Sequence, residues 1–324
     1  MTSKPLGIRP DYLKFRTQSN PYEVLEAVRP AFDTLGPCLS LGKAGRGHDG
    51  WETCHPLMVS GIEVAQLDHG GASQKGWLRF HMRGEGCEWV QFWDPMAKLV
   101  DVLKDAELRR VDLAMTTFDG EASHDAVIEA HGMGLFQSDR GGVSPHYRVI
   151  GGSDPRAGRT IYVGNRAGAK MARCYEKGWE MLKDTPASTR DGCTALSFNG
   201  SPSRHPASIY RVEVEFKAVD GYVIPWPMLA DPDTFFAGAY PYCADLCRNS
   251  RPAFVPRLPD WRPLTTLARA LDNCRTAYGS HLAAALEFYN GDAAAVLALL
   301  TENRAPSRML VDAGLLTLGP PDAH

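Results

Sequence analysis

A tyrosine in a basic segment is the residue whose type and setting point most directly to chemistry. Tyr175 lies within residues 160–180, TIYVGNRAGAKMARCYEKGWE, which predicts a strand, a glycine-bearing basic turn and a second strand ending at the tyrosine. Strand alternation places Arg173, Tyr175 and Lys177 on one face. A phenolate can attack a phosphodiester and hold one side of the break as an ester. Because a free phenol has a pKa of about 10, nearby cations or a metal must favour ionisation. The alternative is an ordinary strand tyrosine flanked by surface charge.

Carboxylates on two other predicted strands could serve the same reaction. Asp112 lies in the middle of RRVDLAMTTF, and Glu213 and Glu215 alternate with apolar residues in RVEVEFK. Carboxylates on the inner face of a sheet are costly unless they are paired or bind a cation. Hard oxygen ligands suit Mg²⁺ or Mn²⁺, which can withdraw charge from a scissile phosphate. Glu176 is a further acidic residue behind this set. The alternative is an exposed sheet face with Glu–Arg pairs between strands.

The chain is slightly acidic as a whole, but one segment of it is basic. The chain has 324 residues, a net charge of −3 and eight cysteines, which are too few and too scattered for a disulfide framework. Cys243 and Cys247 lack a second pair that would complete a zinc site. Residues 156–217 carry eleven basic and six acidic side chains. This segment could contact a phosphate backbone, although a solvated surface would have the same composition.

Short strands and helices must position these residues. Strand patterns cover residues 11–18, 52–59, 62–67, 76–82 and 109–118, then 146–150, 159–164, 171–176 and 209–217. Helices are predicted from the Asn20-Pro21 start to Gly36, over residues 94–105 and over residues 123–131. Residues 185–206 are predicted to form a long loop. The second group of strands repeats the rhythm of the first, so two similar halves are expected.

The carboxyl-terminal part differs in character. Residues 1–222 are predicted to form an α+β catalytic domain, residues 223–263 a connector rich in proline and aromatic residues, and residues 264–324 a helical region. Helices are expected over residues 292–300 and 307–315. We expect no membrane span and no secretory signal, because long apolar runs are absent from the sequence. A cytoplasmic protein is the resulting prediction.

Taken together, these patterns resemble the replication initiation factor family of filamentous phages and rolling-circle plasmids. That family has a strand of the form Thr-hydrophobe-Tyr-hydrophobe-Gly, a basic turn, then Arg-hydrophobe-Tyr-acid-Lys and a later Arg-hydrophobe-Glu strand. The matching positions here are Thr160 to Gly164, Arg166 to Lys170, Arg173 to Lys177 and Arg211 to Glu213. Upstream, Arg110 and Asp112 match the family's Arg-hydrophobe-Asp strand, and the resemblance is densest over residues 110–217.

The resemblance implies a fold and an activity. The fold would be two similar antiparallel halves with backing helices, forming a curved DNA-binding sheet. Such initiators nick one strand of a replication origin through the tyrosine equivalent to Tyr175, with a divalent cation. They stay attached to the 5′ phosphate, leave a 3′ hydroxyl for a host polymerase, and later reverse the chemistry. The residues implied are Tyr175, Arg173 and Lys177 in catalysis, Asp112, Glu213 and Glu215 as ligands of Mg²⁺ or Mn²⁺, and Arg166, Lys170, Arg173, Lys177 and Arg211 in DNA binding.

Some features leave alternatives open. The family strand often carries a second acid after the first, whereas Ala114 and Thr116 stand here, so Asp119 or Glu121 supplies that charge or the cation site is weaker. The sequence has no His-hydrophobe-His pair, which agrees with an acidic metal site. Other tyrosines that could act as a second nucleophile are Tyr162, Tyr210 and Tyr222.

Partners and rival activities also follow from the pattern. Trp51, Trp77, Trp89 and Trp93 could stack on bases, although burial in a core is the usual role of tryptophan. The partner is predicted to be single-stranded or cruciform origin DNA, with a host helicase, a polymerase or a second copy of the chain as further partners. The carboxyl-terminal helices could serve any of these contacts. The alternatives are a conjugative relaxase with the same chemistry, a DNA-binding regulator with a weakened catalytic site, or an α+β protein without nucleic-acid function.

Overall fold

One antiparallel sheet organises most of the chain. The computed structural model describes residues 6–137, 143–198, 201–247, 250–258 and 267–302, and eleven strands of this part form the sheet. Along the sheet the order is β2-β4-β5-β6-β1-β7-β11-β10-β9-β8, and β3 pairs with β4 outside this path. The strands are β1 (Leu6–Thr17), β2 (Leu39–Leu41), β3 (Gly45–Arg46), β4 (Thr53–Val59), β5 (Ile62–His69), β6 (Leu78–Arg83), β7 (Glu107–Thr117), β8 (Tyr147–Ile150), β9 (Thr160–Val163), β10 (Lys170–Tyr175) and β11 (Tyr210–Lys217).

The strand order consists of two corresponding halves. In the first half, β1 is followed by helix α1 (Pro21–Val28), the chain then runs to the outer strands, and β6 returns to pair with β1. In the second half, β7 is followed by helix α5 (His124–Gly132), the outer strands follow, and β11 returns to pair with β7. The two halves meet where β1 pairs with β7. The predicted α+β fold with an antiparallel sheet is therefore confirmed.

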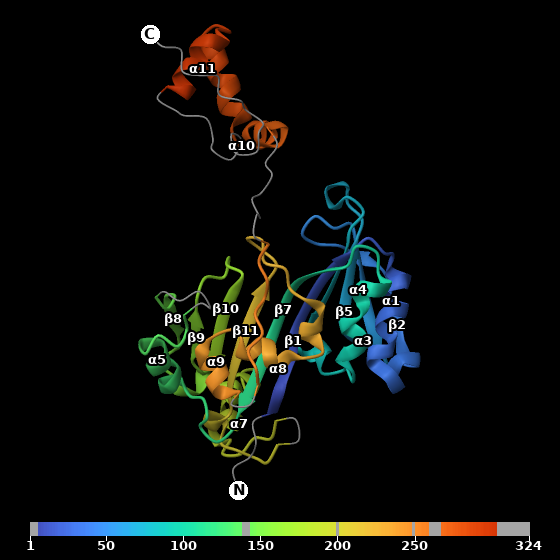
Figure 1. Ribbon diagram of the computed structural model, residues 1–324, viewed down its shortest axis with the longest axis vertical. Coiled ribbons are helices and arrows are strands. Elements are labelled where there is room, and N and C mark those ends of the chain that lie inside the picture. The colour runs from blue at the N-terminus through green and yellow to red at the C-terminus, as the bar shows by residue number, and fades with distance from the viewer. Residues whose placement is uncertain (1–5, 138–142, 199–200, 248–249, 259–266, 303–324) are drawn as a thin grey trace. The chain divides into compact units, whose positions relative to one another are not determined.

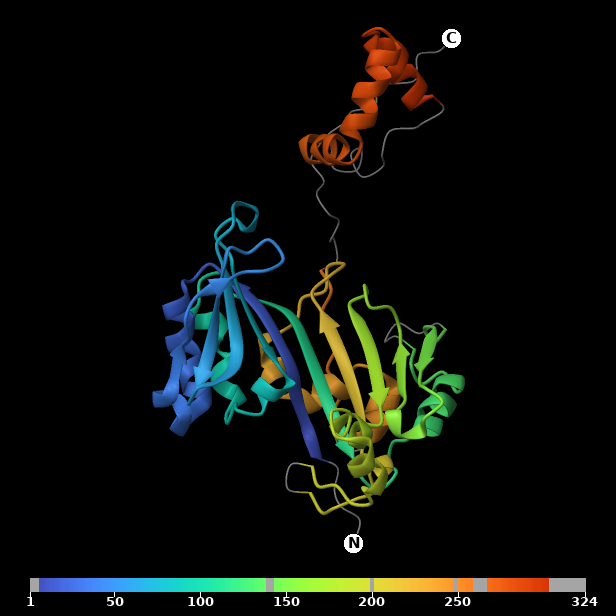
Figure 2. The ribbon, with the colours of Figure 1, turned by 180° about the vertical axis from the view of Figure 1, so that it is seen from behind.

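Strand alternation separates a core face of the sheet from a polar face. Leu13 and Phe15 of β1 and Leu113 of β7 have no exposed surface, whereas Lys14 and Arg110, which are paired across the same two strands, are only partly buried. Helices cover the core face: Figure 1 shows α8 and α9 in front of the sheet, and Figure 2, from behind, shows β1, β7 and β11 in front. We refer to the sheet face opposite the core as the polar face.

Helices form where the sequence supplies caps, and they are shorter than predicted where proline intervenes. Asn20 caps α1 by accepting from the backbone of Tyr22 and Glu23, and the Glu23 side chain reaches back to complete a capping box. Beyond Val28 the predicted helix continues as a 3-10 segment, η1 (Arg29–Cys38), because Pro30 cannot donate a helical hydrogen bond. The helix predicted over residues 94–105 is divided into α3 (Trp93–Ala97) and α4 (Leu99–Val102).

The segment predicted as a connector over residues 223–263 supplies part of the cover of the sheet. It contains η5 (Trp226–Leu229), α8 (Pro232–Ala237) and α9 (Pro241–Leu246). Trp226, Met228 and Phe236 belong to the core, and the Trp226 ring lies 5.6 Å from that of Phe15. The chain accordingly divides into two compact units at residues 1–259 and 260–324. The prolines interrupt the helices, but the apolar residues between them are buried.

The second unit is helical where it is described. It contains α10 (Leu267–Phe288) and α11 (Ala293–Thr301), and Asp292 caps α11 by accepting from the backbone of Ala295. The helix predicted over residues 307–315 lies outside the described residues. Across the described chain, every helix is too short or too polar to cross a bilayer.

Candidate active site

The last residues of β10 bring the predicted nucleophile to the polar face. Tyr175 is paired with Arg211 on β11 and with Thr160 on β9, and Arg173 is paired with Glu213 and Tyr162. Between them Cys174 points to the core and has no exposed surface. The predicted alternation thus holds for Arg173 and Tyr175. Lys177 follows at the start of helix α6 (Lys177–Met181), so it is not part of the strand.

Cations surround the phenol of Tyr175. Nη2 of Arg173 donates to Oη of Tyr175 over 3.4 Å, and the Arg173 guanidinium lies 4.7 Å from the centre of the ring. Arg211 is the cross-strand partner of Tyr175 and its positive charge acts on the phenol, while Nζ of Lys177 is 6.0 Å from the ring centre. The structure therefore places all three predicted cationic residues around the tyrosine.

Burial and charge act in opposite directions on this phenol. Only 6% of Tyr175 is exposed, and burial raises the pKa of its hydroxyl above the ordinary value. Glu213 also raises this pKa, whereas Arg211 and Arg173 lower it. A phosphate that approached the phenol would meet the two guanidinium groups, which favour both the phenolate and the charge of the phosphate.

An aromatic residue that sequence reasoning missed packs beside the same cations. The Phe198 ring lies 5.2 Å from the Arg211 guanidinium and 5.9 Å from Nζ of Lys177. Phe198 is 5% exposed and forms a small apolar cluster with Phe118 and Ile209. It belongs to the segment predicted as a long loop, which contains the helix α7 (Ala187–Gly192) and a backbone bridge between residues 196 and 204. A loop without periodicity gave no indication of this contact.

A carboxylate from β1 also reaches the site. Oδ1 of Asp11 accepts from Nη1 of Arg211 over 2.9 Å. The pairing of β1 with β7 shifts between Pro10 and Tyr12, and this bulge adds a residue at Asp11. Because simple alternation assigns Asp11 to the face opposite Tyr12, the sequence pattern alone could not place it here.

The three predicted metal ligands fall into two groups. Oε2 of Glu213 accepts from Nη2 of Arg173 over 2.7 Å, which ties Glu213 to the tyrosine. Asp112 and Glu215 are paired across β7 and β11, and Nη2 of Arg110 lies 2.6 Å from an oxygen of each. Glu176, the further acidic residue, bonds to Arg159 instead. Asp112 and Glu215 therefore form a separate pair that shares one cationic nitrogen.

The charged form of Asp112 is disfavoured by its surroundings. The pair nevertheless has two cations, because Lys217 also forms an ion pair with Glu215. Burial raises the pKa of the Asp112 carboxyl to about 7, and the neighbouring Glu213 and Glu215 act in the same direction. Arg110 opposes them. Burial likewise raises the pKa of Glu213, although Arg173 lowers it. Additional positive charge would stabilise the ionised carboxylates.

Asp112 and Glu215 fit one requirement of a divalent cation. Magnesium in proteins is commonly held by one or two carboxylates together with substrate phosphates. Because both carboxylates reach the same nitrogen of Arg110, they can also reach one cation. Within the residues that the structure describes, no group of three His, Cys, Asp or Glu side chains is placed to hold a metal ion. The pair thus fits a cation that shares its coordination with phosphate, and Glu213 does not join it.

The acidic residues considered as substitutes on the family strand lie away from this pair. Asp119 accepts from Arg204 over 2.9 Å, and Glu121 accepts from the backbone N–H groups of Phe118 and Asp119. Thr116, which stands at one of the family's acidic positions, accepts from Nε of Arg211 over 3.1 Å. The threonine therefore positions the arginine that contacts Tyr175.

Two of the predicted DNA-binding residues lie away from Tyr175. Arg166 is exposed in the turn between β9 and β10, where its guanidinium lies 5.5 Å from the ring of Tyr162. Lys170 is three residues from Arg173 and so points to the core side, where it donates to the backbone oxygen of Ala239 and lies 4.4 Å from the Tyr240 ring. Arg166 remains on an accessible surface, whereas Lys170 contributes to a cavity on the other side of the sheet.

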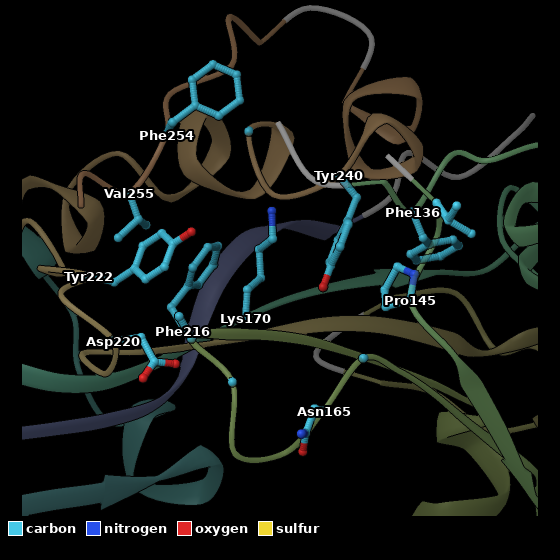
Figure 3. A pocket seen from close by; sticks show the side chains of 15 residues that line it. Phe136, Pro145, Asn165, Lys170, Phe216, Asp220, Tyr222, Tyr240, Phe254 and Val255 are labelled. Atoms are coloured by element: carbon cyan, nitrogen blue, oxygen red, sulfur yellow. The ribbon is translucent and has the colours of Figure 1, made fainter. Parts of the chain in front are cut away.

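That cavity has a volume of 340 Å³ and is mainly aromatic and apolar. Figure 3 shows Lys170 between Phe216 and Tyr240, with Tyr222 and Phe254 beyond Phe216. Tyr222, one of the possible second nucleophiles, thus lies at the cavity. Tyr210, another, is 2% exposed and belongs to the core. Of the three, only Tyr162 shares the polar face with Tyr175.

Comparisons with known proteins agree with the resemblance in the sequence. Residues 106–261 match the sequence model of a family described as replication initiation factor. The predicted relationship to this family is therefore confirmed over the segment that contains Asp112, Tyr175, Glu213 and Glu215.

One solved structure and the curated sequences complete the comparison. The chain is similar to the structure of a rolling circle replication initiator protein from Geobacillus stearothermophilus, with 17% sequence identity and a TM-score of 0.48. The similarity covers 72% of this chain and 84% of that chain. No curated protein sequence matches the chain.

Proposed function

We propose that this protein initiates rolling-circle replication by nicking one strand of an origin with Tyr175 and later rejoining it. The observation that supports this proposal best is the arrangement around the phenol. Arg173 donates to both Tyr175 and Glu213, and Arg211 is paired with the tyrosine across the strands. A nucleophile, a proton acceptor and two fixed cations are thereby assembled on the polar face of the sheet.

The proposed cleavage step exchanges one phosphate ester for another. Oη of Tyr175 attacks the scissile phosphorus, and the bond between phosphorus and the 3′ oxygen breaks. Glu213 accepts the phenol proton, and the 3′ oxygen keeps the electron pair of the broken bond and takes up a proton. The products are a 5′-phosphotyrosine and a free 3′ hydroxyl that a host polymerase can extend. In rejoining, a 3′ hydroxyl attacks the phosphotyrosine and releases the phenol.

The cations around the tyrosine supply most of the stabilisation in this proposal. Phosphoryl transfer depends mainly on positioning and on neutralising the charge of the phosphate. Arg173 and Arg211 do this at the phenol, and their own ion pairs with Glu213 and Asp11 fix their positions. A Mg²⁺ or Mn²⁺ ion held by Asp112 and Glu215 would withdraw further charge from the phosphate.

Covalent capture tests the proposal directly. The full chain is incubated with Mg²⁺ or Mn²⁺ and supercoiled DNA that carries candidate origins, alongside the variants Tyr175→Phe and Tyr162→Phe. We expect nicked circles and a protein–DNA adduct with the wild type and with Tyr162→Phe, and neither product with Tyr175→Phe. Tyr162 is the matched control because it lies on the same face of the neighbouring strand.

The other outcomes would identify a different function. Equal nicking by wild type and Tyr175→Phe would move the nucleophile elsewhere. Salt-sensitive DNA binding without cleavage at any origin would favour a DNA-binding regulator. Cleavage at a conjugative transfer origin in preference to replication origins would favour a relaxase with the same chemistry.

A further inference from the structure

The first half of the sheet carries a group of basic residues on the same polar face as Tyr175. The antiparallel register of β1 and β6 places Arg16 opposite Arg79, Lys14 opposite His81 and Tyr12 opposite Arg83. The residues between them on β1, Leu13 and Phe15, point to the core and have no exposed surface. We call Lys14, Arg16, Arg79 and Arg83, with the nearby Trp51 and Trp77, the amino-terminal cationic face.

Like charges dominate the centre of this face. Arg79 is neutralised by Asp68 at 2.8 Å and Arg16 by Glu107 at 2.7 Å. In the described part of the chain, neither Lys14 nor Arg83 has a carboxylate within ion-pair distance. Like charges that face each other across strands destabilise a sheet. Burial, and then Arg79 and Arg110, lower the pKa of Lys14, so the folded protein tolerates repulsion at this position.

Aromatic rings hold two of the arginines in place. The Arg16 guanidinium lies 4.1 Å from the ring of Trp77, and that of Arg79 lies 5.4 Å from the ring of Trp51. Arginine stacked on an aromatic ring keeps its N–H donors at the edge of its plane, where they can bond to phosphate oxygens. Tryptophan beside a basic groove is also a platform for base stacking. Charge and aromatic rings together are the combination that binds nucleic acid.

This face lies on the same side of the same sheet as Tyr175 but at some distance from it. From β10 to β1 there are three strand spacings, and six residues along β7 separate the partners of Arg211 and Lys14. With strand spacings of about 4.8 Å and a rise of about 3.4 Å per residue, Lys14 lies about 25 Å from Tyr175. The family match begins at residue 106, so β1 and β6 lie outside it.

We propose that the amino-terminal cationic face binds the phosphate backbone of the origin DNA over a stretch that leads away from the nick. The inference rests on the proposed function, because it assigns a second contact to the DNA that Tyr175 cuts. The unpaired charges of Lys14 and Arg83 bind phosphates, and Arg16 and Arg79 supply the stacked donors around them. Single-stranded and duplex DNA share this backbone, and the experiment distinguishes them.

Two neutralising substitutions test the proposal in the full chain. Lys14→Gln with Arg83→Gln is compared with a control, Lys98→Gln with Arg251→Gln, which removes the same charges from exposed positions outside the cationic face. Binding is measured by fluorescence anisotropy at several salt concentrations, with one sequence prepared as a single strand and as a duplex. The salt slope is the steepness with which the logarithm of the binding constant falls with the logarithm of the salt concentration. Each lost phosphate contact lowers it by about 1.

We expect the salt slope to fall by about 2 and the affinity to fall about tenfold in the Lys14/Arg83 variant alone. If the loss is seen with the single strand, the bound stretch of origin DNA is single-stranded; if it is seen with the duplex, the bound stretch is double-stranded. Lys14→Arg keeps the positive charge at the half-buried position, so this variant should bind DNA like the wild type. Arg83→Gln alone removes one of the two charges, at an exposed position, and should lower the salt slope about half as much as the double variant. Unchanged affinity and salt slope for both forms of DNA would overturn the proposal.

Cleavage assays separate this inference from the proposed function. On a short oligonucleotide that contains little beyond the nick site, the Lys14/Arg83 variant should form the covalent adduct as fast as the control. On a long origin fragment at limiting concentration, its adduct should form about tenfold more slowly. If the wild type forms no adduct on either DNA, the proposed function fails, while the binding measurement still decides the cationic face.

Discussion

The two halves of the sheet have corresponding strand orders but opposite chemistry on their polar faces. In the second half, the strand that returns to the centre is β11, and it presents Glu213 and Glu215 beside Arg211. In the first half the returning strand is β6, and it presents Arg79, His81 and Arg83. One arrangement of strands therefore supports a site where acids and bases are balanced and another where basic residues predominate. The fold thus fixes where side chains point, and the residues on the polar face give each half its own charge.

The halves also differ in how their charges are held. Arg211 is 2% exposed and pairs with Asp11, and Glu213 is 5% exposed and pairs with Arg173. Arg83 in the first half is exposed. Buried charges need fixed partners, since each unpaired ion in the interior is costly, whereas an exposed charge remains available to an outside partner. This difference can be tested by removing one charge from each half.

The largest effect is expected at Arg211. Arg211→Met should lower the free energy of unfolding by about 3 kcal/mol, because the carboxylate of Asp11 is left partly buried without its partner. The same change at the exposed Arg83 should alter it by less than about 0.5 kcal/mol. Urea denaturation of both variants measures the difference. Equal stability losses would show that the two halves do not differ in this respect.

A double variant separates the effect of Arg211 on stability from its effect on nicking. Arg211→Met combined with Asp11→Asn should recover part of the lost stability, because no charge is then left without a partner. Nicking should stay low in the double variant, since the phenol of Tyr175 still lacks one of its two guanidinium groups. Recovery of full nicking would remove Arg211 from the proposed mechanism.

The next effect is expected from corresponding positions of the two returning strands. Glu213→Gln should slow formation of the covalent adduct about 100-fold, because a positioned proton acceptor typically contributes that much. His81→Gln on β6 should leave the rate unchanged on a short oligonucleotide. Single-turnover adduct formation with excess enzyme gives both rates. A slow His81→Gln variant would mean that the first half takes part in the reaction itself.

The smallest effect is expected at the carboxylate pair. Glu215→Gln should raise the Mg²⁺ or Mn²⁺ concentration needed for half-maximal nicking about tenfold, because one of two hard ligands becomes neutral. DNA affinity in the presence of a chelator should be unaffected in this variant, and the wild type should not nick under that condition. The titration is repeated with Glu176→Gln as a control, since Glu176 bonds to Arg159 away from the pair. Identical metal titrations for all three proteins would exclude Glu215 as a ligand.

Much of the second half could be predicted from the sequence because strands there alternate without interruption. The spacing of Arg173 and Tyr175, and of Glu213 and Glu215, placed each pair on one face, and the structure has the same pairs on the polar face. The same rule separates Lys170 from Arg173, which are an odd number of residues apart. The resemblance implies a DNA-binding role for Lys170, whereas the structure has this residue at the aromatic cavity.

Other features depended on contacts that a single sequence does not display. Asp11 reaches the site through a bulge, which is set by the pairing of β1 with β7 rather than by the residues of β1 alone. Phe198 comes from an irregular segment with no periodicity to interpret. The proline-rich segment after residue 222 covers the sheet because Trp226 and Phe236 are buried, although its prolines suggested a connector. Local pattern predicts strands well, and tertiary packing decides where irregular segments lie.

The pairing of β1 with β7 has a consequence for how the protein would select DNA. These strands join the two halves by direct antiparallel pairing over residues 6–16 of β1, with the bulge at Asp11 among its register shifts, and no loop lies between them to act as a hinge. The separation between Tyr175 and the cationic face is therefore a constant of the molecule. If Tyr175 cuts the DNA and the cationic face binds it as proposed, the protein would measure length, because the anchored stretch and the cleaved bond would have to lie at one set distance.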